Sequence, residues 1–105
     1  MAATRSVTLT SPKFGEVTIP QLVFREPKMN DLIANGEPYI PTRSPDGATI
    51  VVENMAAIAG LASDCLIEPF GMTAIIEQLA LRDALAVKDA IIGFFTDARS
   101  DPAPS

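Results

Sequence analysis

The sequence contains no histidine and a single cysteine, Cys65. Without histidine, the chain lacks both the commonest general base and the commonest metal ligand. One cysteine can form no disulfide within the chain, and it supplies too few thiolates for a structural zinc site. Because no histidine can activate it, Cys65 is expected to be a semi-buried thiol rather than a nucleophile. We therefore predict that the protein is not an enzyme and holds no cofactor or metal.

Basic residues are missing from a long central span. Between Ser44 and Leu81 there is no Lys or Arg, and the carboxylates in that span are Asp46, Glu53, Asp64, Glu68 and Glu77. The net charge of −5 belongs to this span, since basic and acidic residues balance elsewhere. Binders of nucleic acid or anionic membrane need clustered Lys and Arg, so we expect neither partner. A basic or amphipathic protein partner fits this charge, although acidity alone also provides solubility.

Long hydrophobic runs are also missing. No apolar stretch reaches the ~20 residues that span a bilayer, and residues 1–5 lack the apolar centre of a signal peptide. Charged residues make up 20% of the chain and apolar residues 48%. We expect a cytoplasmic protein of one small domain with some apolar surface left for a partner. The alternative is that the many alanines account for the apolar share and the surface is ordinary.

Two pairs of carboxylates are the only raw material for catalysis. Asp83 and Asp89 lie six residues apart on a predicted helix, and Asp64 and Glu68 lie four apart near a predicted loop. Acid–base chemistry or magnesium binding requires such groups to converge in a cleft, for which a small helical chain offers little room. Because charged side chains are mostly exposed, we expect both pairs on the solvated surface.

The first quarter of the sequence predicts a β-hairpin over residues 6–26. Apolar and polar side chains alternate there, and the segment 11–15 supplies turn chemistry. The predicted inward face consists of Val7, Leu9, Ile19, Leu22 and Phe24. Since an isolated hairpin is marginal in water, this face must pack on the helices that follow.

Four helices are predicted after the hairpin, over about residues 28–35, 49–62, 73–79 and 81–98. Prolines and an Asp-Gly pair predict a loop over 37–47, and Pro69 predicts a break over 63–71. Residues 99–105 are predicted to be a disordered tail. The predicted fold is therefore α+β, with a single domain over residues 1–98. In it, the N-terminal β-hairpin packs on a small bundle of three to four α-helices.

The closing helix carries the clearest pattern. Its apolar arc holds Leu81, Ala84, Leu85, Val87, Ile91, Ile92, Phe94 and Phe95, and Lys88 lies inside the arc and must extend its amine to solvent. The opposite arc holds Arg82, Asp83, Ala86, Asp89, Gly93 and Asp97. We expect the apolar arc to provide most of the core. The small residues Ala86, Ala90 and Gly93 would permit weak self-association, although such stretches are more often incidental.

A corner follows the hairpin, where Arg25-Glu26-Pro27 ends the strand and Asp31-Leu32 comes soon after. Pro27 restricts Glu26 to extended backbone, and Asp31 suits the positive end of the next helix. We therefore interpret Arg25, Glu26, Pro27, Asp31 and Leu32 as a structural motif. Contact with a partner is the alternative, because loops beside a sheet edge often bind.

These features follow one order along residues 7–95. The first part runs through Leu9–Pro12, Gly15, Val17, Leu22, Phe24, Arg25, Pro27 and Asp31-Leu32. The second part runs through Ala56–Leu61, Leu79, Asp83-Ala84-Leu85 and Ile91–Phe95. This order, together with the chain length, resembles the tail assembly chaperone family of contractile-tailed phages.

The resemblance implies a function in virion morphogenesis for a phage or prophage protein. Proteins of that family bind the long, helical, apolar tape measure protein and keep it soluble until the tail tube polymerises around it. They are then lost from the mature particle, so the expected location is the cytoplasm of the bacterial host. The tail tube protein is a second candidate partner. The alternatives are a structural tail or baseplate subunit and a generic protein-interaction domain.

The expected partner surface lies within the acidic span. Flexible methionines suit adaptable contacts with an irregular apolar partner, and the helical elements of this span are the weakest in the chain. The residues predicted to bind the partner are Met55, Glu68, Phe70, Met72 and Glu77.

Overall fold

The computed structural model describes residues 4–100. Four strands come first in this part of the chain, and helices and further strands follow. In order they are β1 (Thr4–Thr8), β2 (Lys13–Phe14), β3 (Val17–Thr18), β4 (Gln21–Arg25), α1 (Met29–Asn35), β5 (Tyr39–Arg43), β6 (Thr49–Glu53), α2 (Met55–Cys65), β7 (Leu66–Glu68), the 3-10 helix η1 (Thr73–Gln78) and α3 (Leu81–Ser100). The predicted α+β class is confirmed.

The main sheet has three antiparallel strands in the order β1-β4-β7. Thr4 pairs with Arg25 and Val7 with Leu22, and between these strands the chain makes a second small hairpin from β2 and β3. All five side chains predicted for the inward face are buried. Strand β7 and the end of α2 both fall in the segment 63–71, for which Pro69 predicted a break. The predicted hairpin is thus two strands of a larger sheet.

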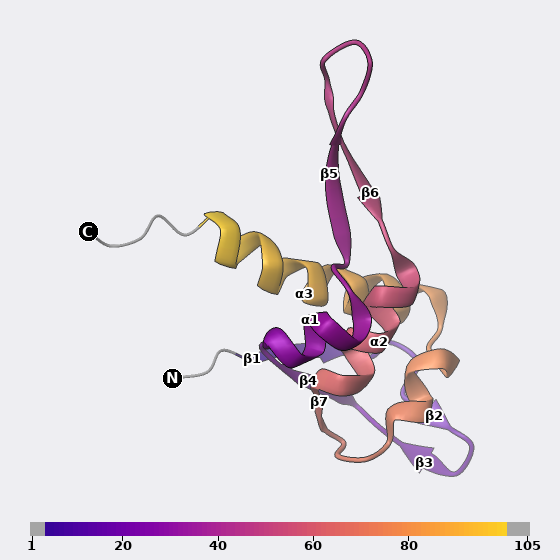
Figure 1. Ribbon diagram of the computed structural model, residues 1–105. Coiled ribbons are helices and arrows are strands. Elements are labelled where there is room, and N and C mark those ends of the chain that lie inside the picture. Colours follow the sequence, from indigo (N-terminus) through magenta and orange to yellow (C-terminus); the bar gives the residue numbers. More distant parts are fainter. Residues whose placement is uncertain (1–3, 101–105) are drawn as a thin grey trace.

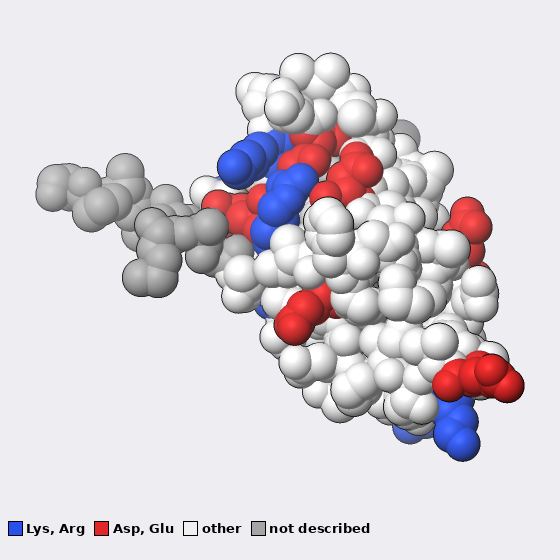
Figure 2. Space-filling view, turned by 90° about the horizontal axis from the view of Figure 1, so that it is seen from below, with Lys and Arg blue, Asp and Glu red and all other residues white. Residues whose placement is uncertain are grey.

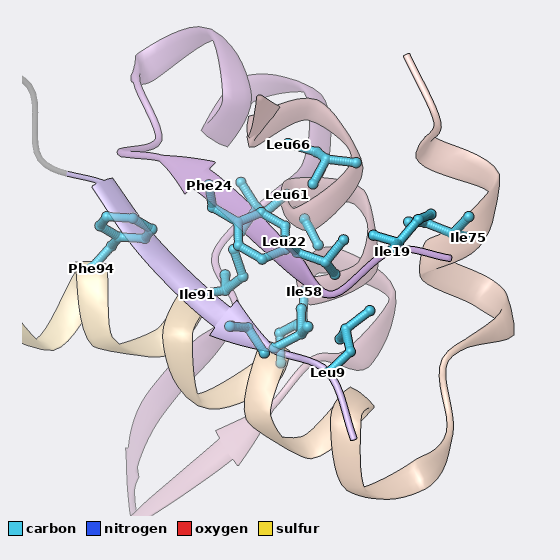
Figure 3. Close-up of a cluster of buried hydrophobic side chains, with 13 residues drawn as sticks. Leu9, Ile19, Leu22, Phe24, Ile58, Leu61, Leu66, Ile75, Ile91 and Phe94 are labelled. Carbon is cyan, nitrogen blue, oxygen red and sulfur yellow. The ribbon is translucent and has the colours of Figure 1, made fainter. Parts of the chain in front are cut away.

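The core lies between this sheet and the helices (Figure 3). Leu22 and Phe24 of β4 are fully buried, as are Leu61 of α2 and Ile91 of α3. The 3-10 helix adds Ile75. Because α2 and α3 both contact elements of the sheet, the alternating face of the strands is covered by apolar helix faces.

The region 37–53 differs from its prediction. Residues 39–43 and 49–53 form β5 and β6, an antiparallel two-stranded arm that stands away from the body (Figure 1). The predicted loop over 37–47 and the predicted helix start at 49 are therefore wrong. The β-branched run Ile50-Val51-Val52 favours a strand over a helix. The helix α2 begins at Met55, where the Asn54 side chain accepts a hydrogen bond from the Ala57 N–H at 3.2 Å.

The buried face of the closing helix, α3, differs from the apolar arc that was predicted for it. Leu81 and Leu85 are exposed, whereas Ala86 and Gly93 are partly buried. A methyl group on Gly93 would lie 2.6 Å from Nη1 of Arg5. The small-residue stretch of Ala86, Ala90 and Gly93 therefore lies on a helix that packs against β1 of the same chain. That stretch is therefore not a free surface for self-association. Residues 99 and 100 belong to α3, and the rest of the predicted tail, 101–105, lies outside the described residues.

Candidate functional site

The Arg25 corner is a bidentate ion pair. The guanidinium donates from Nη1 to Oδ2 of Asp31 at 2.8 Å and from Nη2 to Oδ1 at 3.1 Å. The Lys28 N–H donates to the same carboxylate at 2.7 Å, which caps α1, and Asp31 is buried. The Arg25 hydrogen bonds come first among the causes that hold the pKa of Asp31 below its usual range. The charged carboxylate is thus an integral part of this corner.

The same arginine connects the corner to the end of α2. Its Nη2 donates to the Asp64 carbonyl at 3.1 Å, and the Asn35 amide donates to the Asp64 carboxylate at 2.8 Å. Strand β4 and helices α1 and α2 therefore meet through polar contacts of Arg25, Asp31 and Asn35. These contacts support the structural interpretation of the motif.

A groove of about 420 Å³ lies beside the corner. Its residues come from the corner, from α1 and from the last turns of α3: Glu26, Pro27, Leu32, Glu37, Phe94, Phe95, Ala98 and Arg99. Three residues of the predicted motif, Glu26, Pro27 and Leu32, therefore line a surface. Sequence analysis did not anticipate the groove, because it depends on α3 ending next to α1. The lining of the groove combines apolar side chains with two carboxylates and one guanidinium.

The five predicted partner residues do not line one common cavity. Met55 is half exposed and borders a small cavity of about 70 Å³ whose walls come from α2, η1 and α3. Phe70 is 88% exposed, the highest value among the large apolar side chains. Met72 is half-buried against the core. Glu68 and Glu77 are exposed, and Glu68 lines a different cavity from Met55.

The arm carries most of the exposed β-branched surface. Ile40 of β5 and Ile50, Val51 and Val52 of β6 each expose about half of their area. Two contacts with α3 fix the root of the arm. Lys88 donates to Oε1 of Glu53 at 3.1 Å, and the Arg99 guanidinium lies 4.9 Å from the centre of the Tyr39 ring. The Lys88 amine was predicted to reach solvent, and it instead forms an ion pair with Glu53.

Asp83 overturns the prediction that both acidic pairs are solvated. It is only 1% exposed, and its Oδ1 accepts hydrogen bonds from the Thr10 N–H at 2.8 Å and the Thr10 hydroxyl at 2.9 Å. Its Oδ2 accepts from the Ser11 N–H at 3.0 Å. These bonds, that of the Thr10 N–H first, hold the pKa of Asp83 below its usual range. Asp83 therefore fastens the turn after β1 to the first turn of α3, while Asp89 is exposed.

Cys65 is fully buried at the end of α2. Removal from water raises the pKa of its thiol to about 11, so the thiol is protonated at neutral pH.

Within residues 4–100, no three His, Cys, Asp or Glu side chains lie where they could hold a metal ion. No helix in that range is both long enough and apolar enough to cross a membrane.

Charge is sparse on the side of the molecule opposite the arm. Figure 2 views this side and shows a wide uncharged area, with basic side chains gathered in a few places next to acidic ones. No broad basic face is visible there.

Comparison of the chain with protein families, with curated protein sequences and with solved structures finds no match.

Proposed function

We propose that the protein is a non-enzymatic tail assembly chaperone that binds the phage tape measure protein and keeps it soluble during tail morphogenesis. The observation that carries the proposal is the exposed apolar surface of the acidic span. Between Ser44 and Leu81, seven large apolar side chains are exposed: Ile50, Val51, Val52, Met55, Ile67, Phe70 and Leu81. The same span contains no basic residue. Such a surface suits an apolar helical partner whose own charge is neutral or basic.

This function rests on a resemblance in the order strand, turn, strand, Arg-x-Pro and Asp-Leu. In the fold, Arg25 and Asp31 of that order form the bidentate pair that connects β4 to α1. The motif behind the resemblance thus has a structural role in this chain.

The proposed contact residues remain Met55, Glu68, Phe70, Met72 and Glu77. Met55 begins α2 one residue after Asn54 ends the connection from β6, so its exposed side chain continues the apolar surface of the arm. Phe70 lies between β7 and η1 and presents a nearly uncovered ring. A long helical partner can contact several separate apolar positions, which suits this dispersed set better than one compact pocket.

A structural tail or baseplate subunit is the second candidate function. The arm favours it, because a projecting two-stranded arm is well placed to contact neighbouring subunits in a permanent assembly. The two functions differ in where the chain ends up. As a chaperone it would act in the host cytoplasm and be absent from the mature virion, with the tail tube protein as a further contact during assembly.

Co-expression tests the proposal. The tape measure protein encoded with this chain is expressed alone and together with it, and the soluble fraction of each culture is quantified. We expect the soluble tape measure protein to increase and to co-purify with the chain. Insolubility in both cultures, with no co-purification, would overturn the proposal.

Charge reversal then locates the contact. Glu68→Lys with Glu77→Lys should weaken co-purification, since both carboxylates belong to the proposed surface. Glu16→Lys with Asp89→Lys is the matched control, because it reverses two exposed carboxylates outside the span and changes the net charge equally. Equal retention by both double variants, with loss in Phe95→Ala, would move the contact to the groove beside the corner.

A further inference from the structure

The two long edges of the arm are unequal. Among the described residues, β5 and β6 pair only with each other, so the outer edge of each strand is free. Free edges of this kind offer rows of unpaired N–H and C=O groups, and they are natural places for another strand to add. The composition of the two edges decides which of them can accept a strand.

The hydrogen bonds at both ends of the arm fix which groups point outward. Ser44 N–H donates to the Ala48 carbonyl at 2.7 Å, and Asn54 N–H donates to the Pro38 carbonyl at 2.8 Å. Antiparallel pairs alternate between hydrogen-bonded and non-hydrogen-bonded. Counted from either end, the facing pair Pro41 and Val51 is non-hydrogen-bonded. The backbone groups of both residues therefore point away from each other, toward the outer edges.

Proline blocks one edge and leaves the other open. Pro41 has no N–H, so the outer edge of β5 lacks its central donor. The outer edge of β6 presents complete backbone groups at Thr49, Val51 and Glu53. The edge of β6 is thus the one that can accept a strand.

We propose that β6 pairs with β6 of a second copy of this chain. The outward groups lie at positions 49, 51 and 53, which are symmetric about Val51. A two-fold axis at Val51 places Val51 against Val51 of the second copy and Thr49 against its Glu53, and both kinds of pair are hydrogen-bonded. This contact is self-complementary, as a two-fold interface must be. It joins two arms into one four-stranded antiparallel sheet.

The charges of the arm agree with this pairing. Arg43 faces Thr49 in the arm, and Thr49 faces Glu53 of the second copy, so all three share one row on one face of the joined sheet. Each dimer has two such rows, and each brings an Arg43 toward an opposite charge. Because the arms run antiparallel, the two acidic bodies lie at opposite ends of the joined sheet. The net charge of −5 on each chain therefore opposes pairing only weakly.

Cross-linking of the full chain tests the pairing directly. Paired residues at a hydrogen-bonded position have Cα atoms ~5.5 Å apart, within the range that a disulfide spans. Val51→Cys should therefore form a disulfide-linked dimer under mild oxidation. Thr42→Cys is the matched control, because it is also exposed but lies on the outer strand, where ~14 Å separates the outer strands of the dimer. The native Cys65 is buried and should not react.

Sedimentation gives a second and independent readout. The parent chain should reach twice the 11.1 kDa mass of one chain as its concentration rises. Val51→Pro removes an outward N–H and no hydrogen bond between β5 and β6, so the arm should persist while the dimer dissociation constant rises at least ~10-fold. A monomeric parent at all concentrations would overturn the proposal. So would equal cross-linking of the Val51→Cys and Thr42→Cys variants, which would indicate random collision.

Discussion

Replacing the buried carboxylate of Asp83 by an amide tests how the fold is fastened. In Asp83→Asn the side chain keeps its size, and its oxygen can still accept from Thr10. Its NH₂ group, however, faces the Ser11 N–H, which loses its carboxylate acceptor. Losing a charged acceptor and leaving a donor unpaired costs about 2 kcal/mol of unfolding free energy. In a domain of this size, that should lower Tm by about 10 °C.

The pH dependence of the Asp83→Asn effect distinguishes loss of charge from a general packing defect. The folded-state pKa of Asp83 is lower than the value of ~3.9 for an unfolded aspartate. The ionised group therefore adds stability above about pH 4, and this stability is lost as the pH falls through the folded pKa. The difference in unfolding free energy between parent and variant should be full at pH 7 and should shrink below about pH 4.

Urea unfolding followed by circular dichroism measures both effects. Asp89→Asn is the control, because it removes a carboxylate from an exposed position on the same helix and should change stability by less than ~0.5 kcal/mol. If Asp83→Asn destabilises no more than Asp89→Asn, the three hydrogen bonds do not fasten the turn to α3. The reasoning would then be refuted.

Three further predictions concern the core, the thiol and the corner. Ile91→Ala should cost ~2–5 kcal/mol in unfolding free energy, because Ile91 is fully buried, and Leu81→Ala should cost far less because Leu81 is exposed; equal Tm values would contradict the placement of α3. Cys65 should resist a thiol reagent at pH 8 in the native protein and react after unfolding in urea, since its pKa is about 11; rapid native labelling would show an accessible thiolate. Arg25→Ala should lower the unfolding free energy by ~3–5 kcal/mol, because the buried Asp31 loses its partner. Lys28→Ala should be nearly neutral, since the Lys28 backbone N–H binds Asp31. Similar Tm values for the two variants would count against the ion pair.

Alternation of apolar residues was sufficient to predict the inward face of the hairpin. Val7, Leu9, Ile19, Leu22 and Phe24 have side chains that only one face of a strand can bury together, so local pattern and tertiary packing agree. The apolar period from Leu81 onward predicted the helix α3 but only part of its buried face, since Leu81 and Leu85 are exposed and Asp83 is buried. The sequence period and the buried face coincide in the hairpin, where every predicted inward side chain is buried.

The arm was missed because its sequence satisfies two patterns. Val51, Val52 and Met55 fit a helical stripe, while the β-branched residues fit a strand, and short apolar runs do not separate the two. In the fold, both faces of β6 are largely exposed, so burial gives no periodic signal there. The deciding factor is pairing with residues 39–43, which lie in a proline-containing segment that resembles a loop.

The buried carboxylate and the groove could not be read from the sequence for a related reason. Asp83 is buried by contacts with Thr10 and Ser11, more than seventy residues away. The groove beside the Arg25 corner forms where α1 meets the end of α3. Both features depend on contacts between distant segments, whereas sequence patterns report local structure.

We propose that this chain binds the tape measure protein during assembly and then leaves. Quantitative mass spectrometry of tail-assembly intermediates and of purified mature virions tests this proposal. We expect the chain to accompany the tape measure protein in the intermediates and to be absent from the virions. Stoichiometric presence in mature virions would contradict it and favour a structural subunit.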